Sequence, residues 1–377
     1  MNKEMLDSNL CSRLREVVNK TDIFYKDKIQ SQKFDFICAF MDRFDFAVNY
    51  LNEHTVKPKT EIELMTYLMQ ASIVRDGIKL CYELLGLEEE ISNSYFKEYC
   101  VRDIECEPAN DDKYFEYFRS LSFAHPLDTT RSIPNRLTQE KQFSPYCLID
   151  LHNLRNDEDA VGVMVYSNMR ESFSLTIPFQ TLKDYLKFKY SLITNIINKF
   201  NEIIIEMETS WKKRKVNRKQ NDIDILKEVV EILEERYLEH YHIDDLIEYL
   251  TCELTVSENK KNVEIFRSKI RGIVLPICDA LDNYETDVMN DLCNSVLSLR
   301  PKAHQMMHYQ LEKIFCYLND DGYGDIDWGL TQADAFSKEF AKKWVVIKPY
   351  EMNFNEIKLL TSVACYLEYK EQNPEEE

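Results

Sequence analysis

Apolar and polar residues follow a helical period over most of the chain. Between residues 34 and 51, apolar side chains recur every three or four positions, and a second such face begins after Thr60 and stops at Gly86. Thr60 and Glu63 form the Thr-x-x-Glu capping pattern that opens helices, and a glycine commonly ends them. Shorter helices are expected over residues 3–19, near 88–101, and from 111 to the proline at 126. These segments predict an N-terminal helical bundle.

The pattern changes from a helical period to alternation after Arg131. Residues 145–152 and 160–167 are predicted to be strands, and apolar and polar residues alternate cleanly over 172–177, as in a half-buried strand. Together they predict a three-stranded antiparallel meander, which must pack one face on helices. One long amphipathic helix is predicted next, from about 181 to 215, and its length favours a bridge between domains or a dimer seam.

The pattern is helical again past residue 220. Segments near residues 223–237, 243–254, 262–281, 285–299 and 303–318 fit a second bundle, with Pro276 expected to kink one helix. The chain is therefore predicted to be mainly α. Three parts are expected: a helical bundle over residues 1–140, the meander with the long helix over 141–220, and a C-terminal helical domain over 221–377.

Composition agrees with a helical protein and narrows the chemical class. The 377 residues include only 7 glycines and 10 prolines, which leaves little turn chemistry. The 11 cysteines show no CxxC spacing, the N-terminus has no apolar signal core, and no apolar run approaches membrane-spanning length. We therefore expect a reduced, cytoplasmic protein without membrane association. Nothing resembles a glycine-rich phosphate loop, a nucleophile elbow or a kinase signature, so no cofactor is expected.

The stretch from Tyr114 to Arg131, YFEYFRSLSFAHPLDTTR, concentrates the candidate chemistry. Six positions separate Arg119 from His125, which on a regular helix would place their side chains about 120° apart. Proline disfavours the α conformation in the residue before it, so His125 should leave the helix and can turn back toward Arg119. Imidazole transfers protons near neutral pH, and a planar guanidinium binds phosphate oxygens. The stretch therefore predicts a site for phosphodiester chemistry, with Ser120 and Arg131 in the same span.

Arg119, five intervening residues and His125 fit the R-x4-6-H motif, and with its helical surroundings this region resembles the HEPN superfamily of ribonucleases. The resemblance implies a metal-independent endoribonuclease in which the RNA 2′-hydroxyl attacks the adjacent phosphate at a homodimer interface. Toxins and antiviral defence are the usual settings. Arg119 and His125 would be catalytic, and Ser120 or Arg131 auxiliary. Ser120 stands where the family often has Asn, Asp or His, and Pro126 is unusual, since the motif usually continues into a final helix.

Other interpretations of the same residues remain open. Arg236 and His242 repeat the spacing in a charge-rich helix end, without the helix break and hydroxyls of the first pair. The competing interpretation of Arg119 and His125 is a helix C-terminus in which the histidine satisfies a backbone carbonyl, within a non-catalytic helical sensor or adaptor. On the helix before Gly86, a trio formed by Arg75, Asp76 and Lys79 is either a solvent-facing charge pair or a contribution of Arg75 to the site.

The net charge of -19 counts against a protein coated for nucleic acid, but its distribution is uneven. Residues 131–220 carry 15 Lys or Arg against 10 Asp or Glu, and the sharpest cluster is WKKRKVNRK. Its candidate RNA contacts, by base stacking and by phosphate pairing, are Trp211, Lys212, Lys213, Arg214, Lys215, Arg218 and Lys219. The alternative is a solvated helix end whose cations complement the helix dipole.

Two patterns are weak metal candidates. His304 and His308 are four positions apart, but HQMMH lacks the glutamate of a zinc protease and no third ligand is identifiable. The segment from Asn319 to Leu330, NDDGYGDIDWGL, is similar to a calcium loop, with Leu330 in place of the bidentate glutamate. No metal site is therefore predicted.

Overall fold

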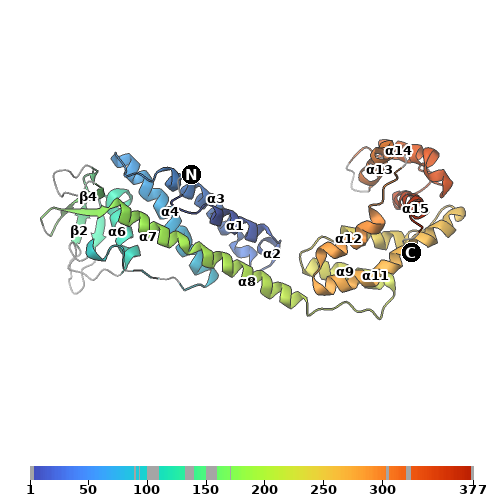
Figure 1. The fold of residues 1–377 in the computed structure, drawn as a ribbon, viewed down its shortest axis with the longest axis horizontal. Helices are drawn as coiled ribbons and strands as arrows, with labels where there is room; N and C mark the ends of the chain where they lie inside the picture. Colours follow the sequence, from blue (N-terminus) through green and yellow to red (C-terminus); the bar gives the residue numbers. More distant parts are fainter. Residues whose placement is uncertain are drawn as a thin grey trace. The chain divides into compact units, whose positions relative to one another are not determined.

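The protein is mainly α-helical with one small antiparallel sheet, as the sequence predicts (Figure 1). The computed structural model describes residues 4–88, 91–92, 94–99, 110–131, 140–149, 159–169, 171–302, 305–319 and 324–374. Its internal contacts divide the chain into two units, Met1–Ile205 and Glu206–Glu377, where three parts were expected. Among the described helices, none combines the length and the apolar character needed to cross a membrane.

The first unit is a helical bundle built around α3 and α4. Its helices are α1 (Asn9–Asn19), α2 (Ile23–Lys26), α3 (Phe34–Glu53), α4 (Glu61–Leu85), α6 (Asp111–Arg119), α7 (Phe179–Ser191) and α8 (Ile193–Trp211), the last of which runs past the unit boundary. Helix α4 lies between α3 and α7 and packs on both, and α1 packs on α3 (Figure 1). The predicted long helix corresponds to α7 and α8, and its residues up to Ile205 belong to this unit.

Helix α4 begins and ends at the residues that the sequence predicts. The Thr60 hydroxyl accepts a hydrogen bond from the Glu63 backbone N–H at 3.2 Å, which caps the first turn. The Glu63 carboxylate accepts the Lys59 N–H at 2.7 Å, one residue earlier than in the standard capping box. At the other end Gly86 has φ 65°, the left-handed conformation in which glycine ends helices.

The sheet is larger than the predicted meander. Its strands are β1 (Thr129–Arg131), β2 (Glu140–Phe143), β3 (Cys147–Leu148), β4 (Ala160–Ser167) and β5 (Phe173–Pro178). Strand β4 is central, because its Val163 lies opposite Cys147 of β3 on one edge and Leu175 of β5 on the other. This antiparallel β3–β4–β5 arrangement confirms the meander. Strands β1 and β2 were not predicted, because TTR and EKQF carry no apolar alternation.

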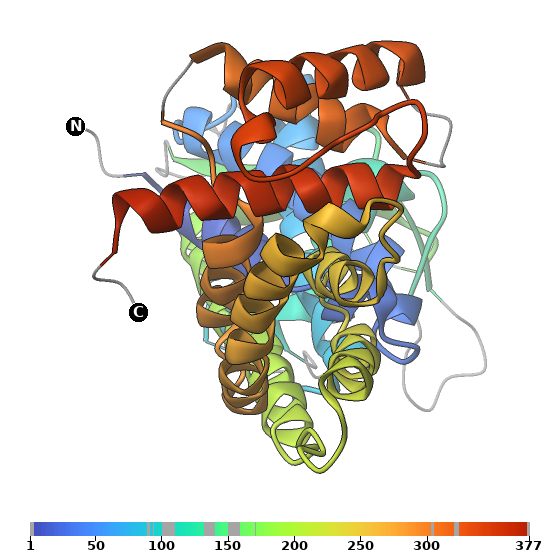
Figure 2. The ribbon, with the colours of Figure 1, turned by 90° about the vertical axis from the view of Figure 1, so that its right-hand side faces the viewer.

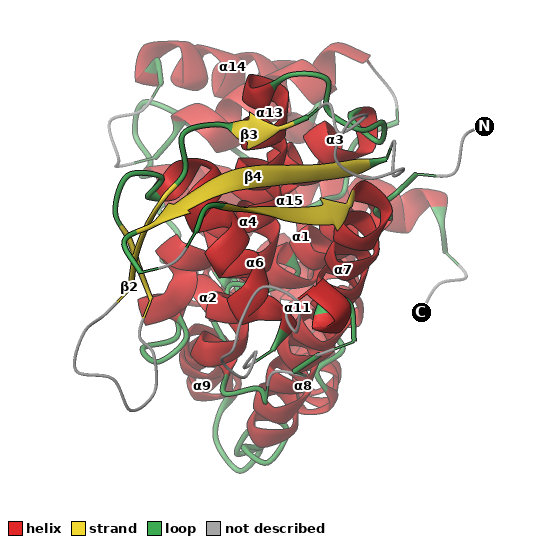
Figure 3. Cartoon of the chain, turned by 90° about the vertical axis from the view of Figure 1, so that its left-hand side faces the viewer, coloured by secondary structure: helices red, strands yellow, loops and turns green. Residues whose placement is uncertain are grey.

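The sheet packs against the helices at one end of the first unit (Figure 3). Strand β5 leads directly into α7, and the Glu61 carboxylate at the start of α4 accepts the Cys147 N–H at 3.1 Å. The alternating valines of β4, at positions 161, 163 and 165, are fully buried. The sheet therefore covers the region where α4 and α7 begin and where α6 ends.

The predicted long helix is interrupted once, at Leu192, between α7 and α8. The Leu192 carbonyl accepts a hydrogen bond from the Tyr82 hydroxyl at 3.2 Å, and that hydroxyl accepts one from the Asn195 amide at 2.9 Å. A buried tyrosine of α4 therefore supplies a bond at the point where the regular helical pattern lapses. Apart from this interruption, the predicted helix is confirmed as far as Trp211, whereas residues 212–215 are not helical.

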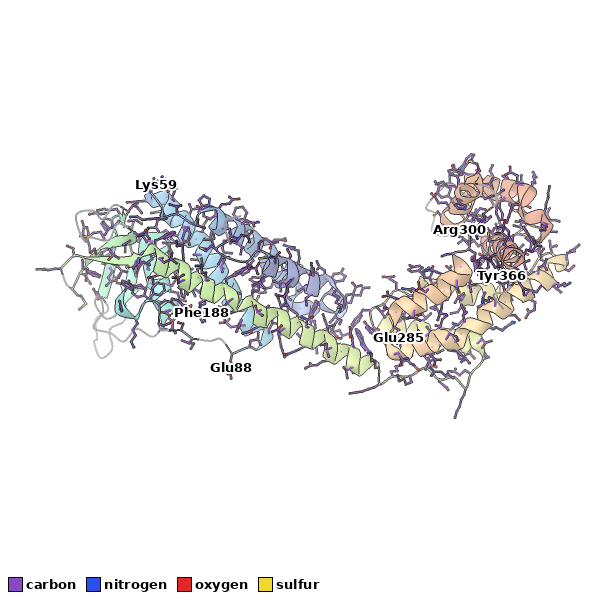
Figure 4. The ribbon with its side chains drawn as sticks, in the orientation of Figure 1. Lys59, Glu88, Phe188, Glu285, Arg300 and Tyr366 are labelled. Carbon is purple, nitrogen blue, oxygen red and sulfur yellow. The ribbon has the colours of Figure 1, made fainter. Side chains whose placement is uncertain are left out.

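The second unit is a helical bundle with its own apolar core. Its helices are α9 (Asp222–Glu235), α10 (Tyr241–Thr251), α11 (Lys260–Asn283), α12 (Thr286–Leu297), α13 (Gln305–Tyr317), α14 (Ile326–Glu339) and α15 (Phe354–Gln372). Helix α15 crosses the unit and contacts α10, α11, α12 and α13 (Figure 2). Tyr366, labelled in Figure 4, lies on α15. Its ring packs on that of Phe266 of α11, with centroids 5.4 Å apart. The sequence predicted five of these helices and missed α14 and α15.

Candidate functional site

Helix α6 carries the candidate arginine and is fixed at its start by two polar side chains. Asn110 is the N-cap, and its side chain accepts the Lys113 N–H at 2.9 Å. Asp111 follows in the first turn. Its carboxylate is buried and accepts backbone N–H groups from the turn at residues 94–96 at distances of 2.8–3.3 Å. These bonds anchor α6 to the preceding segment.

The helix widens after Arg119 into a π-helical segment, Ser120–Ala124, before it ends. The closing bond runs from the His125 N–H to the Ser120 carbonyl at 2.8 Å. His125 has φ -142° and ψ 51°, so it has left the helix, as the following proline predicts. Its side chain is exposed, and no hydrogen bond or ion pair joins the imidazole to the described residues. The imidazole therefore does not satisfy a helix-end carbonyl, which was the competing interpretation.

The Arg119 side chain turns toward α4. Its Nη1 donates to Asp76 Oδ2 at 2.9 Å, while its Nε is buried and has no hydrogen-bond partner among the described residues. The side chain remains 26% exposed. Among the described residues, no hydrogen bond joins Arg119 to His125. The structure thus places the two candidates on one helix end, with the guanidinium held by α4 and the imidazole directed to solvent.

Arg75, on α4, lies beside Arg119 and shares the same carboxylate. Its Nη1 is 3.0 Å from Asp76 Oδ1 and 2.9 Å from Glu116 Oε1, and its side chain is only 2% exposed. The guanidinium carbon lies 5.6 Å from the centre of the Phe115 ring, a cation–π contact. Arg75 is therefore not part of a solvent-facing charge pair. The interpretation in which it serves the Arg119 site agrees with these contacts.

We call Arg75, Asp76, Lys113, Glu116 and Arg119 the arginine cluster. Burial raises the pKa of Glu116, but hydrogen bonds from Lys113 and Arg75 outweigh burial, so its pKa lies below the usual value. Burial likewise lowers the pKa of Arg75, and the carboxylate charge of Asp76 reverses that effect, so its pKa lies above the usual value. Three cations face two carboxylates, so the cluster carries one formal positive charge, spread along α6 from Lys113 in its first turn to Arg119 at its end. Such a charge attracts an anion such as phosphate.

The two auxiliary candidates lie on either side of His125. Ser120 opens the π-helical segment, is partly buried, and binds the His125 N–H through its carbonyl. Arg131 ends strand β1 opposite Glu140, and its side chain lies outside the described part of the structure. No hydrogen bond among the described residues joins the Ser120 side chain to Arg119.

The sequence analysis did not identify a buried lysine that lies next to the start of α6. Lys189 is fully buried, and its Nζ lies 2.6 Å from Asp112 Oδ2, while the Tyr185 hydroxyl donates to Asp112 Oδ1 at 2.5 Å. Burial, and then the charge of Asp112, raises the pKa of Tyr185 well above its usual value. These bonds tie α7 to the first turn of α6. The signal was a lysine on the buried stripe of an amphipathic helix, where a charge requires a partner.

The second match to the motif is structural. Arg236 is 2% exposed, and its guanidinium donates to three backbone carbonyls: Leu281 at 2.5 Å, Trp211 at 2.9 Å and Arg214 at 3.2 Å. It therefore joins the end of α11 to the end of α8. Burial lowers the pKa of His242, which is partly buried.

Half of the cations in the basic segment 211–219 are engaged within the second unit. Arg214 forms ion pairs with two glutamates of α9, and Arg218 lies 2.6 Å from Asp279 and 2.7 Å from Asp282. Lys215 donates to the Asp282 carbonyl at 2.7 Å. These contacts stabilise the start of the second unit and neutralise part of the segment's charge.

The remaining candidates of the segment differ in availability. Trp211 is partly buried, and its ring packs against Tyr284 with centroids 5.6 Å apart, which hinders stacking on a base. Lys212, Lys213 and Lys219 are exposed, and their ammonium groups have no hydrogen-bond or ion-pair partner among the described residues. Three lysines of the six cations thus remain able to contact a phosphate backbone.

The two metal patterns give no site in the described structure. His304 lies outside the described residues, and the ring of His308 contacts the Pro301 carbonyl at 3.0 Å. Residues 320–323 of the calcium-like segment are also outside, and Asp325 caps α14 by accepting the Trp328 N–H at 3.0 Å. Over the described ranges, no group of three or more His, Cys, Asp or Glu side chains is placed to hold a metal ion.

No protein-family model, curated protein sequence or solved structure matches this chain.

Proposed function

We propose that the chain is a metal-independent endoribonuclease of the HEPN type, with its site at the end of α6. The observation that carries the proposal is the exposed imidazole of His125, which has no hydrogen-bond or ion-pair partner among the residues that the structure describes. Six positions before it, the Arg119 guanidinium belongs to a cluster with one formal positive charge. An imidazole free of protein partners can exchange protons with a substrate. A neighbouring positive cluster supplies attraction for the phosphate.

In the proposed reaction, His125 accepts the proton of an RNA 2′-hydroxyl, and the resulting oxygen attacks the adjacent phosphorus. The bond from phosphorus to the 5′-oxygen breaks, which leaves a 2′,3′-cyclic phosphate and, once a protonated imidazole has returned the proton, a 5′-hydroxyl. Arg119 neutralises the non-bridging oxygens as negative charge builds in the transition state. A second copy of the chain is the proposed source of a second imidazole, and Ser120 and Arg131 are auxiliary.

The adaptor interpretation retains one supporting observation. The ion pair between Arg119 and Asp76 is a contact that a purely structural arginine also makes. An adaptor would need no exposed histidine at this place, however, and replacement of His125 would then leave its properties unchanged. RNA as substrate, a homodimer and a cytoplasmic role in defence or as a toxin all belong to the ribonuclease proposal.

The test compares RNA cleavage by the purified protein and by His125→Ala, with EDTA present throughout. A matched control is His54→Ala, because His54 is also an exposed histidine of the first unit but stacks on Tyr50 of α3. We expect cleavage by the unaltered protein and by the control, and a loss of at least about a hundredfold in His125→Ala. Equal cleavage by all three proteins, or none by the unaltered protein, would contradict the proposal.

A further inference from the structure

Asp76 lies between the two guanidinium groups of the arginine cluster. Its Oδ1 contacts Arg75 Nη1 at 3.0 Å, and its Oδ2 contacts Arg119 Nη1 at 2.9 Å. The carboxylate comes from α4 and the second arginine from α6, so this one side chain connects the scaffold helix to the helix end that carries the candidate site. Its own side chain is 40% exposed and therefore lies at the edge of the cluster.

Arg75 is a buried cation whose ion pairs are directed at two carboxylates. Its side chain is only 2% exposed, and its Nε and Nη2 are buried without a hydrogen-bond partner in the described structure. A buried charge with unsatisfied donors is destabilising unless its remaining contacts compensate. The contacts it does make are directed at Asp76 and Glu116, which fixes the orientation of both carboxylates.

We propose that Asp76, held by Arg75, is the positioning residue of the site: it orients Arg119 so that the free edge of the guanidinium meets the phosphate. This inference rests on the proposed ribonuclease function and deepens it. Asp76 takes one terminal nitrogen of Arg119, while the other terminal nitrogen makes no hydrogen bond to the described residues. A guanidinium carries five N–H donors in a fixed fork, so a carboxylate on one edge leaves donors for an oxygen on another.

A competing role for Asp76 is occupation of the phosphate position, which substrate would have to displace. The geometry favours positioning, because the buried Arg75 holds the other carboxylate oxygen and resists displacement. The two roles predict opposite effects of neutralisation. Loss of an orienting group slows cleavage, whereas loss of a competitor accelerates it.

The experiment measures kcat and KM for RNA cleavage by the full-length protein and by Asp76→Asn, with Glu83→Gln as the control. Glu83 is an exposed carboxylate on the same helix, outside the arginine cluster, so its neutralisation matches the charge change alone. Binding of a 2′-O-methyl RNA, which cannot be cleaved, is measured in parallel. We expect kcat of Asp76→Asn to fall about tenfold to a hundredfold, since misplacing a catalytic group is costly. Binding should hold or strengthen, because one negative charge is gone.

The results separate the possible failures. Cleavage by the unaltered protein with unchanged or increased kcat in Asp76→Asn would overturn the positioning role alone, and absence of cleavage by the unaltered protein would overturn the proposed function with it. A parallel fall in kcat and in the melting temperature would assign Asp76 a merely structural role. Asp76→Glu, which keeps the charge on a longer side chain, should give a kcat between those of Asp76→Asn and the unaltered protein at an unchanged melting temperature.

Discussion

Arg119 and Arg236 occupy the same place in two copies of one sequence pattern, and replacing each by methionine should produce opposite phenotypes. Methionine keeps an unbranched chain of similar reach and removes the charge and the donors. Arg119→Met should abolish RNA cleavage with little effect on stability. Arg236→Met should destabilise the second unit and leave cleavage unchanged at temperatures where the protein is folded.

The magnitudes follow from the contacts of each guanidinium. Arg236 is 2% exposed and donates to three carbonyls, so at about 1 kcal/mol net for each hydrogen bond its loss costs about 3 kcal/mol. In a unit of this size that corresponds to a melting temperature lower by about 6–12 °C. Arg119 makes one ion pair and is 26% exposed, so its loss costs about 1 kcal/mol or less. Removal of its contact with the transition state should slow cleavage by about a hundredfold to a thousandfold.

The assay combines calorimetric unfolding with RNA cleavage. Cleavage is measured about 20 °C below the lowest melting temperature among the compared proteins, so that every variant is folded despite the expected shift. Arg236→Met is the control for Arg119→Met, since it removes the same chemical group from the same motif spacing. A large stability loss in Arg119→Met with normal cleavage, or lost cleavage in a folded Arg236→Met, would refute the assignment of the two matches to different roles.

Two further predictions concern the second unit. Burial, and then the charge of Glu248, raises the pKa of Asp245 from 3.8 to about 6, so the folded state binds its proton more tightly than the unfolded state and stability falls as pH rises from about 4 to 6. Asp245→Asn should therefore raise the unfolding free energy at pH 7 by about 1 kcal/mol, after allowance for partial exposure. In urea titrations the variant should also show a weaker dependence of stability on pH between about 4 and 6. An equal pH slope in both proteins would show that Asp245 does not have a raised pKa. Replacing Lys212, Lys213 and Lys219 together by glutamine should reduce the slope of log affinity against log salt for single-stranded RNA by about 2, and an unchanged slope would show that these lysines do not contact phosphates.

Local patterns predicted most of the helices and the core of the sheet. Thr60 and Gly86 bound α4 because capping and the left-handed conformation are decided by residues within one turn. The apolar alternation of residues 172–177 located β5 for the same reason. Strands β1 and β2 were not predicted, because neither segment has an apolar pattern that would mark it as a strand. They belong to the sheet through pairing alone: β1 pairs with β2, and β2 pairs with β4.

The candidate site was predicted in part. Pro126 correctly predicted that His125 leaves the helix, because proline restricts the backbone conformation of the residue directly before it. The predicted approach of the imidazole to the Arg119 guanidinium is not seen as a hydrogen bond in the described residues, because Asp76 holds the guanidinium instead. That partner is 43 positions away, and helical periodicity does not reveal which residues of α4 meet α6. The burial of Arg75 was missed for the same reason.

The most direct test of the account is the chemistry of the RNA ends produced in EDTA by the unaltered protein and by His125→Ala. Attack by the 2′-hydroxyl with His125 as the proton acceptor predicts fragments with 2′,3′-cyclic phosphate and 5′-hydroxyl ends, and their loss in the variant. A single 2′-deoxynucleotide at the cleaved position should block the reaction. Fragments with 5′-phosphate ends, or cyclic phosphate formed equally by His125→Ala, would contradict the central claim.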